Sequence, residues 1–352
     1  MALIGFCTPT MLVVPPPRHP PPGQIRRNPA LPYAEVVDSV TLDDVDRGLL
    51  HALQLDGRAP FSRLAPILEV SERTLARRYR RLLDTGGLRV TGVADTGHVG
   101  HAEWLVRLRV RPDATAALAR ALARRADTAW VTVIAGGAEL TCLFRVPGDA
   151  PLPELGRHPA VHAVDAQRVL RHVMRHRWRG RMSALSIEQS AVLRTPHTEP
   201  AAPVAPSELD QRLLPALAAD GRAAYPRLAR AVGWSESAVR RRVEELRHAR
   251  VLGFDVEIDP ALFGFTVQSL LWLTVAPAKL VTVATALAAD PEAAFVAATT
   301  GPHNVLVCVV CRDTDALFRY TTERIGTLSG IDRMEISPIS GYAKRTAPPI
   351  HT

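Results

Sequence analysis

The stretch Asp46-Arg-Gly-Leu-Leu-His-Ala-Leu-Gln-Leu-Asp-Gly-Arg58 occurs a second time as Asp210-Gln-Arg-Leu-Leu-Pro-Ala-Leu-Ala-Ala-Asp-Gly-Arg222. The two copies are separated by a constant offset, because 210 − 46 and 222 − 58 both give 164, and the same offset carries Ser71 onto Ser235. A repeat of this length indicates a duplicated domain rather than a solenoid, whose units run to about 20–50 residues. The chain therefore contains one structural unit twice.

The composition is that of a globular protein with a basic surface. At 352 residues the chain is long enough for two or more domains, because about 100–200 residues per domain is usual. Its formal net charge of +8 favours a polyanionic partner, either nucleic acid or an acidic membrane surface, although many soluble proteins are basic without one. The four cysteines are too few for a disulfide framework and fit a reducing cytoplasm, which is the predicted location.

Proline-rich stretches divide the chain. Nine of the first 32 residues are proline, so residues 1–40 are predicted to form a disordered tail. A second group of prolines predicts a semi-rigid linker over residues 180–206. No apolar run is long enough to span a bilayer, and a signal peptide is not expected. The predicted domains are residues 41–92 and 100–179 before the linker, and residues 207–256 and 264–346 after it.

Three helices are predicted at the front of each half. In the first half, the third helix begins after Ser71, whose hydroxyl is placed to accept a backbone N–H of the first turn. Its apolar side chains recur at the spacing of one helical face, and its arginines lie on the opposite side. The apolar face consists of Leu75, Tyr79, Leu82 and Leu83 in the first copy and of Val239, Val243 and Leu246 in the second, where Ser235 is the cap.

Two short helices joined by a tight turn, the second rich in arginine, are typical of a helix-turn-helix that binds DNA. The N-terminal residues of such a recognition helix meet base edges in the major groove, while flanking cations contact phosphates. A solvated arginine face on a surface helix is the alternative, but its recurrence in both copies favours DNA binding. Base contacts are predicted for Arg73, Thr74, Arg77, Ser237, Ala238 and Arg241, phosphate contacts for Arg78, Arg81, Arg240 and Arg242, and capping positions at the DNA surface for Ser71 and Ser235.

The back of each half changes to the period of β-strands. Both halves run strand, helix, strand, strand, helix, strand, which is the ferredoxin-like split motif. The copies stay in register with one inserted residue, since Trp130 falls on Phe295 (295 − 130 is 165) and Gly136 on Gly301. The predicted fold class is α+β, with two copies of a winged or helix-turn-helix domain and a βαββαβ domain. Strands are expected at 104–110, 129–135, 139–146 and 161–169, and at 267–275, 293–299, 304–311 and 331–339.

This arrangement resembles the Lrp/AsnC family of leucine-responsive, or feast/famine, transcriptional regulators. The matching stretches are Leu42–Leu83 and Gly100–Val173, then Leu209–Leu246 and Gly264–Lys344. The resemblance implies binding of double-stranded DNA through the third helix and self-association through the AsnC-type βαββαβ domains. It also implies an amino acid or related small effector near the turn between the second and third strands. A usual member has one such unit, so this chain is predicted to be a tandem fusion that acts as a covalent pseudo-dimer.

The effector turn departs from the family pattern Gly-x-x-Asp in both halves. Each copy keeps a glycine, whose missing Cβ lets a ligand approach the backbone closely. Neither copy keeps the aspartate, and a plain tight turn without a ligand is an equally good interpretation. The candidate effector-binding residues are Gly136, Gly137 and Glu139 in the first half and Gly301, His303 and Asn304 in the second.

Two other functions compete with the regulator hypothesis. Siroheme decarboxylases resemble the same tandem unit, and His, Arg and Tyr side chains of their sheet domain contact the tetrapyrrole, but Gly264–Trp272 here is apolar. A scaffold with decayed helix-turn-helix units is the weaker alternative. His172 and His176 have helical ligand spacing but no fixed carboxylate or cysteine partner, so no metal site is predicted. No catalytic residue and no cofactor are predicted, and the chain is not expected to be an enzyme.

Overall fold

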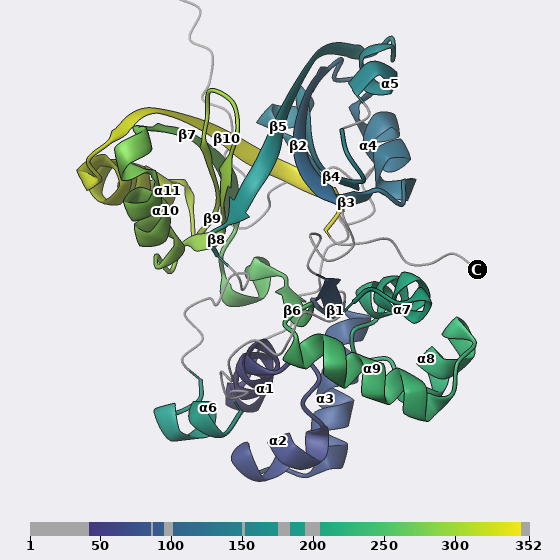
Figure 1. Ribbon diagram of the computed structural model, residues 1–352. Helices are drawn as coiled ribbons and strands as arrows, with labels where there is room; N and C mark the ends of the chain where they lie inside the picture. The colour runs from purple at the N-terminus through teal and green to yellow at the C-terminus, as the bar shows by residue number, and fades with distance from the viewer. Residues whose placement is uncertain are drawn as a thin grey trace, which may run out of the picture.

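The computed structural model describes residues 42–85, 87–94, 101–149, 152–174, 184–193 and 205–345. The predicted tail at 1–40 lies outside the described residues. A helical module occupies the lower part of the molecule and a β-barrel the upper part (Figure 1). None of the helices in the described ranges has the length and apolar character needed to cross a membrane.

The first helix-turn-helix consists of α1 (Asp44–Leu55), α2 (Phe61–Ile67) and α3 (Glu72–Asp84). Asp43 accepts a hydrogen bond from the Asp46 backbone N–H at 2.9 Å and starts α1 as half of a capping box. Leu75 and Leu82 of α3 are fully buried, as the spacing predicts. Leu83 is 37% exposed, so its assignment to the core face was wrong: the inward face of α3 is narrower than expected.

The second helix-turn-helix repeats the first with α7 (Glu208–Ala219), α8 (Tyr225–Val232) and α9 (Glu236–His248). Val239, Val243 and Leu246 are completely buried, which confirms the predicted inner face of α9. These three side chains pack with apolar residues of α7 and α8 in a core of their own.

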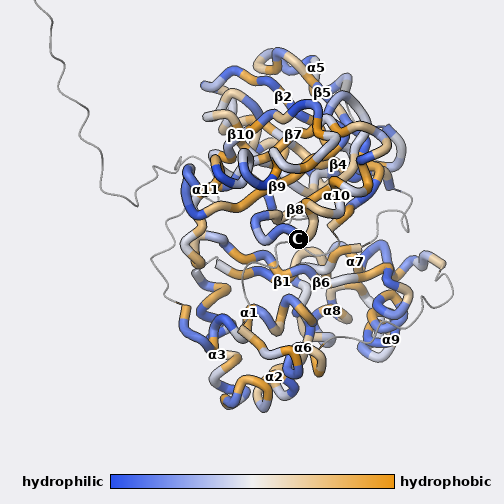
Figure 2. The backbone as a smooth tube through the Cα atoms, turned by 90° about the vertical axis from the view of Figure 1, so that its left-hand side faces the viewer, coloured by the Kyte–Doolittle hydropathy of each residue, from blue (hydrophilic) through white to orange (hydrophobic). Residues whose placement is uncertain are grey.

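A two-stranded antiparallel sheet joins the two copies. Strand β1 (Leu88–Ala94) pairs with β6 (Leu252–Ile258), and the pair at the centre is Thr91 opposite Asp255. These two residues are 164 positions apart (255 − 91), the offset of the duplication, so each faces its own counterpart. A pseudo-two-fold axis therefore passes between them, as in a symmetric dimer. Figure 2 shows α3 and α9 on opposite sides of this strand pair.

Each half continues into a βαββαβ domain in the predicted order. In the first half it consists of β2 (Ala102–Val110), α4 (Thr115–Arg124), β3 (Thr128–Ile134), β4 (Glu139–Val146), α5 (Leu152–Gly156) and β5 (Val161–His172). In the second half it consists of β7 (Val267–Val275), α10 (Leu280–Ala288), β8 (Ala293–Thr299), β9 (Val305–Cys311), α11 (Thr314–Arg319) and β10 (Ile331–Lys344). Short 3-10 turns at Ala135–Gly137, Pro260–Phe263, Pro277–Lys279 and Ile325–Thr327, and a π-helical turn at Tyr320–Arg324, complete the described elements.

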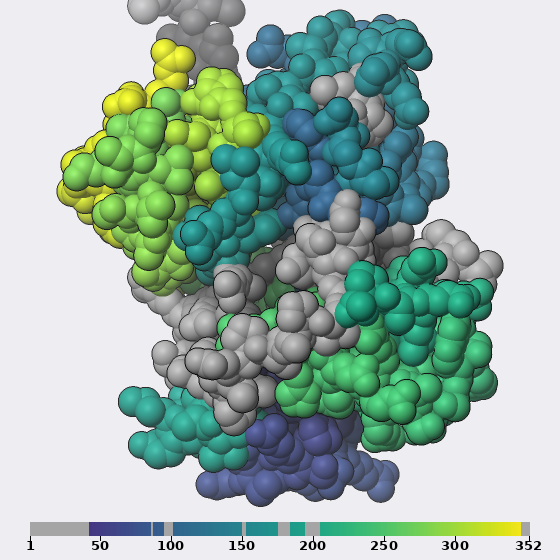
Figure 3. All heavy atoms as spheres, in the orientation of Figure 1, coloured from purple at the N-terminus to yellow at the C-terminus, as the bar shows by residue number. Residues whose placement is uncertain are grey.

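The two sheets join into one closed barrel in the order β10-β3-β4-β2-β5-β8-β9-β7. Two seams connect the halves: β5 pairs with β8 through Val169 and Thr299, and β10 pairs with β3 through Ile339 and Ile134. Between the sheets, Trp272 is 1% exposed and is the largest fully buried side chain among the described residues. The space-filling view shows the two sheet domains in contact along this junction (Figure 3).

The range predicted as a linker contains a further helix, α6 (Ile187–Leu193). It lies before the prolines that suggested an extended segment, and it docks on the first helix-turn-helix (Figure 1). Leu185 and Leu193 are buried in that domain's core, and the side chain of Gln189 donates to the carbonyl oxygen of Ile67 at 2.8 Å. This segment is therefore part of the first domain, and the linker prediction missed a docked element.

Candidate nucleic-acid interface

The N-terminal half of α3 presents an exposed arginine surface. The Ser71 hydroxyl accepts a hydrogen bond from the Thr74 backbone N–H at 3.1 Å and caps the helix. Arg73, Arg77 and Arg80 are exposed and follow one another at helical spacing, so they share one face. Together with Ser71 and Thr74 they line an open surface hollow along the helix. Within the described residues, these three guanidinium groups have no carboxylate at ion-pair distance, which leaves them available to a polyanion.

Arg80 belongs to the predicted arginine face of the third helix, but no DNA contact was predicted for it. Its spacing of seven from Arg73 and three from Arg77 places it on the same face, as predicted. Phosphate contacts were predicted for Arg78 and Arg81 instead.

Arg78 and Arg81 reach back to the start of α1. Nη1 of Arg78 donates to Asp43 Oδ2 at 2.6 Å and to Asp46 Oδ1 at 3.0 Å, and Nη2 of Arg81 pairs with the other oxygen of Asp46. Asp46 is fully buried, so these arginines neutralise a charge that would be costly without a partner. Arg81 keeps a side chain that is 46% exposed, whereas Arg78 is largely enclosed at 21%. The predicted phosphate contact of Arg78 stays a prediction that competes with this structural role.

The second copy repeats this ion pair. Arg242 donates to the two oxygens of Asp210 at 2.6 and 2.8 Å. Burial alone would raise the pKa of Asp210, but the hydrogen bonds from Arg242 and from the Ser207 backbone N–H lower it below its usual value. Arg242 is 12% exposed and is the counterpart of Arg78 at the offset of 164. Both copies thus use this arginine to hold the start of the first helix against the third helix.

The exposed face of α9 is richer in internal ion pairs than that of α3. Ser237 is exposed, Ala238 is half-buried, and Ser235 accepts a hydrogen bond from the Ala238 backbone N–H at 3.3 Å. Arg240 pairs with Glu236 at 2.8 Å and lies over the Tyr225 ring at 4.4 Å from the centroid. Arg241 is 78% exposed and lies 3.5 Å from Glu245.

The repeated Asp-Gly-Arg turn connects the two copies. Arg58 donates to the carbonyl oxygens of Gly221 at 2.7 Å and Ala223 at 3.0 Å. In return Arg222 donates to the carbonyl oxygens of Gly57 at 2.7 Å and Ala59 at 2.9 Å. These contacts are reciprocal, since each residue lies 164 positions from its counterpart. The sequence signal for this role is the arginine preserved in both copies, but the contact itself was not predicted.

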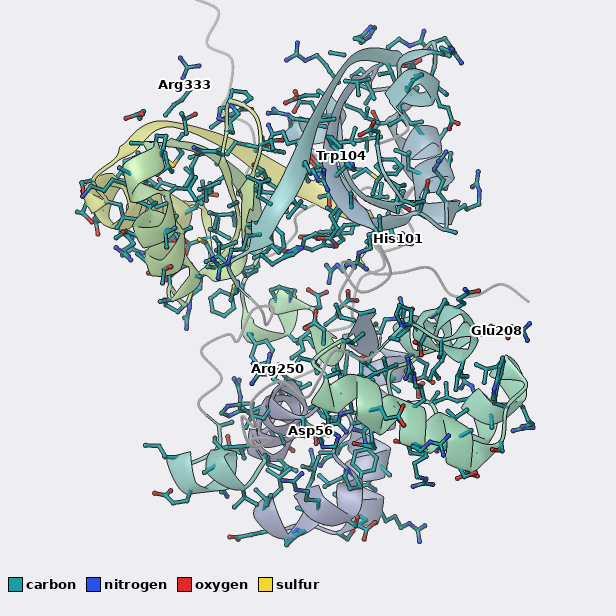
Figure 4. The ribbon with its side chains drawn as sticks, in the orientation of Figure 1. Asp56, His101, Trp104, Glu208, Arg250 and Arg333 are labelled. Carbon is teal, nitrogen blue, oxygen red and sulfur yellow. The ribbon has the colours of Figure 1, made fainter. Side chains whose placement is uncertain are left out.

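Aromatic and acidic groups surround the same junction. Arg58 lies over Tyr225 and Arg222 over Phe61, both at 4.7 Å from the ring centroid, and these two rings are themselves counterparts. Asp56, which Figure 4 labels between the two copies, accepts a hydrogen bond from Arg247 of α9 at 3.2 Å. The junction therefore sets the relative orientation of α3 and α9.

The candidate effector turn of the first half carries a paired carboxylate. Gly136 and Gly137 have φ values of 66° and 96°, and an added Cβ at either would meet open space. The Glu139 side chain accepts a hydrogen bond from Nε of Arg107 at 2.7 Å and is 10% exposed. Arg107 also pairs with Glu335 of the second half and lies 5.0 Å from the centroid of the Trp272 ring. The charge expected to attract an effector is thus already balanced within the protein.

The corresponding turn of the second half is built into the seam. Gly301 has a φ of 91°, and its Cβ position would lie 3.2 Å from Gln167 of β5. The Asn304 side chain accepts a hydrogen bond from the Val275 N–H at 2.8 Å and donates one to the Val275 carbonyl at 2.7 Å. It thus takes the place of a backbone hydrogen-bonding partner for Val275. His303 lies 3.3 Å from the Thr274 hydroxyl. The structure thus gives Asn304 a structural role and places His303 beside it.

The barrel interior is packed with side chains. The rings of Trp130, Phe295 and Tyr342 lie between the sheets with aliphatic neighbours, and the free space there amounts to about 20 Å³, room for about one water molecule. Cys308 and Cys311 are buried in β9. Within the described ranges, no group of three or more His, Cys, Asp or Glu side chains could hold a metal ion. His176 lies outside these ranges.

Known proteins resemble both parts of the chain. The AsnC-type helix-turn-helix domain matches residues 42–83 and 207–247, and the Lrp/AsnC ligand binding domain matches residues 268–349. An HTH-type transcriptional regulator of Pyrococcus abyssi is 31% identical over 138 residues, which is 39% of this chain and 87% of that protein. The regulatory protein AsnC of Escherichia coli is 30% identical over 129 residues, which is 36% of this chain and 85% of AsnC.

Solved structures of one protein are similar over most of the chain. The siroheme decarboxylase NirDL superposes with a TM-score of 0.57 at 14% identity, covering 86% of this chain and 93% of NirDL. At this identity the likeness shows a shared tandem fold. The sequence relatives and the duplicated helix-turn-helix instead identify the kind of protein: the chain belongs to the Lrp/AsnC family of transcriptional regulators.

Proposed function

We propose that the chain is a sequence-specific DNA-binding regulator that acts as a covalent pseudo-dimer. The observation that carries this proposal is the pair of capped helices, α3 and α9, related by the pseudo-two-fold axis between Thr91 and Asp255. A DNA duplex has the same symmetry, so a two-fold protein meets two half-sites about one helical turn, or about 34 Å, apart. In this chain the reciprocal contacts of Arg58 and Arg222 hold the two helix-turn-helix copies together, as an interface between subunits does in a dimer.

The position of each side chain on its helix determines whether it contacts bases or phosphates in this proposal. Arg73, Thr74 and Arg77 lie in the first turns of α3, from which residues of a recognition helix reach base edges. Arginine suits this position because its planar fork donates two parallel hydrogen bonds to guanine. Arg80 lies farther along the same exposed face, where it contacts the phosphate backbone. In α9, Ser237, Ala238 and Arg241 take the base-facing positions, with Arg240 near the phosphates.

Salt dependence tests this function directly. Fluorescence anisotropy with an operator selected from random duplexes should show affinity falling linearly on a log–log plot, with a slope of about −0.9 per neutralised phosphate. Arg80→Ala should reduce the steepness of this slope by about 1 at nearly unchanged sequence preference. Arg319→Ala on α11, outside the helix-turn-helix module, is the control and should leave the slope unchanged. Failure to select any preferred sequence would count against the proposal.

Effector binding and self-association are the finer parts of the proposal. An amino acid or related metabolite would bind at the first-half turn, where Gly136 and Gly137 face open space. It would compete with Arg107 for Glu139, so a weak response is expected. A thermal-shift screen of the twenty amino acids measures this response. The sheet-to-sheet association expected of the family takes place within one chain here, and sedimentation velocity would show whether chains associate further.

The fold shared with NirDL keeps an enzyme as the second candidate. Against it stand the apolar character of Gly264–Trp272 and a barrel interior with about 20 Å³ of free space, far too little for a tetrapyrrole. Mixing the protein with siroheme and recording the Soret region separates the two candidates. A bound spectrum followed by loss of carboxylate groups would establish the enzyme, whereas an unchanged ligand spectrum removes it.

A further inference from the structure

We propose that this regulator binds an asymmetric operator, in which α3 reads a guanine-containing half-site tightly and α9 reads a different, weaker half-site. The proposal rests on the DNA-binding function proposed above and adds the form of the DNA partner. It implies that the protein sits on its operator in a single orientation.

The backbone of the two reading units is symmetric. The strand register places Thr91 opposite its counterpart Asp255, and the reciprocal hydrogen bonds of Arg58 and Arg222 agree in length to within 0.1 Å. Serine caps both recognition helices, and each helix has 13 residues. Both helices are therefore presented to DNA in the same way, and any difference in reading comes from their side chains.

The base-facing side chains differ at two of three positions. Arg77 and Arg241 are counterparts, and both are exposed. Arg73, however, is replaced by Ser237, and Thr74 by Ala238. A serine cannot make the two parallel hydrogen bonds with which arginine selects guanine, and an alanine offers only apolar contact, such as with a thymine methyl group. Helix α3 thus presents two guanine-reading arginines to its half-site, and helix α9 presents one.

Two flanking positions change sign between the copies, whereas Ala76 corresponds to Arg240, which is paired with Glu236. Arg80 corresponds to Glu244, and Arg81 corresponds to Glu245. The shared arginine is affected as well, because Arg241 lies 3.5 Å from Glu245, whereas Arg77 has no carboxylate at ion-pair distance within the described residues. Carboxylates on this face repel phosphates and compete for Arg241. Most of the salt-dependent affinity therefore belongs to α3.

Selection from a random duplex library tests the form of the operator. The full-length chain should enrich two unlike half-sites about one helical turn apart, and hydroxyl-radical footprints should be stronger over one of them. A perfect inverted repeat would overturn the asymmetry while leaving DNA binding intact. Enrichment of no sequence at all would instead contradict the DNA-binding function on which the inference rests, so the two failures are distinguishable.

Two matched variants test which helix reads which half. Arg77→Ala should weaken binding to the selected operator by about 10-fold to 100-fold and relax base preference in the strong half only. Arg241→Ala, the same change at the counterpart position, should weaken binding by about 3-fold to 5-fold and relax the weak half only. Both side chains are exposed, so folding is preserved. Equal losses from the two variants would overturn the assignment.

A conversion variant gives the most direct test. Arg73→Ser combined with Thr74→Ala gives α3 the base-facing residues of α9, and the Ser71 cap is kept because it bonds a backbone N–H. The variant should select an inverted repeat of the weak half-site, where the original chain selects two unlike halves. If it still selects the original asymmetric operator, these residues do not determine the difference and the proposal fails.

Discussion

The two junctions between the halves preserve their symmetry in different ways. At the helix-turn-helix junction the same residue type, arginine, makes the same contacts in both directions, through Arg58 and Arg222. At the barrel seams the positions correspond but the chemistry does not. Contacts from a side chain to backbone carbonyls keep the residue type, because the acceptor is the same in both copies. Contacts between two side chains change more freely, because both partners can change together.

The barrel seams show how both partners of a side-chain contact have changed between the two halves. In one seam Glu103 contacts His172, whose ring lies edge-on to Phe295. In the other seam the Tyr342 hydroxyl donates to Gln268 at 2.7 Å, and its ring stacks on Trp130. Gln268 is the counterpart of Glu103, and Phe295 is the counterpart of Trp130, each at an offset of 165. His172 and Tyr342 occupy equivalent seam positions, since their strand partners Ala297 and Thr132 also differ by 165. At these equivalent positions one seam therefore has an ionisable pair and the other a neutral pair.

The largest effect is expected at the helix-turn-helix junction. Arg222→Ala leaves the carbonyl oxygens of Gly57 and Ala59 without their donor and removes a cation that packs on Phe61, so it should cost about 3 kcal/mol of unfolding free energy. Arg58→Ala should cost the same within about 1 kcal/mol, and both should weaken DNA binding. Urea unfolding measures both variants. Clearly unequal losses would break the symmetry argued for this junction.

The next effect is a difference between the two seams in how the free energy of unfolding depends on pH. Burial raises the pKa of Glu103, but hydrogen bonds from His172 and Arg145 outweigh it and lower the pKa to about 2. The resulting stabilisation is present above the ordinary pKa of 4.5 and is lost as the pH falls towards 2. Glu103→Gln should therefore cost about 2 kcal/mol at pH 7 and remove that part of the acid dependence. Gln268→Ala, at the neutral counterpart of Glu103, is the control and should leave the acid limb unchanged.

A smaller effect is expected at Lys344, which occurs in one seam only. Its Nζ donates to the Arg125 carbonyl at 2.8 Å and to the Thr128 hydroxyl at 2.9 Å, and burial lowers its pKa to about 8. Because the native state releases this proton before the unfolded state does, the free energy of unfolding should rise between about pH 8 and 10.5. Lys344→Met should remove about 1 kcal/mol of this rise. An identical pH profile for both proteins would contradict the buried-cation assignment.

The smallest effect is the difference between the two candidate effector turns. Gly136→Ala places a Cβ in open space at a φ of 66°, which should cost about 1 kcal/mol. Gly301→Ala has a less favourable φ of 91° and a Cβ position 3.2 Å from Gln167, so it should cost somewhat more. Thermal unfolding of the two variants measures the difference. A larger loss at Gly136 would show that the first turn is the more constrained one.

Local patterns in the sequence were sufficient to predict the helices and strands of each half and their order. The offset of 164 identified the duplication, and the alternation of apolar residues predicted the strands of both βαββαβ domains. Serine caps and apolar spacing placed α3 and α9, and only Leu83 was assigned to the wrong face. For the candidate site, the exposed positions of Arg73, Arg77 and Arg241 agree with what the helical period predicts.

Contacts between distant segments could not be predicted in the same way. Arg58 and Arg222 bond turns more than 160 positions away, the role of Arg78 depends on a buried carboxylate in another helix, and α6 is stabilised by docking rather than by its own seven residues. The closed barrel likewise depends on strand pairs between the halves. The sequence by itself determined two copies of one helical and one sheet unit, because their periodicity and caps are local properties of the chain. Only the tertiary structure decided which arginines remain free for DNA and how the halves join, because ion pairs and strand pairing depend on which surfaces meet in space.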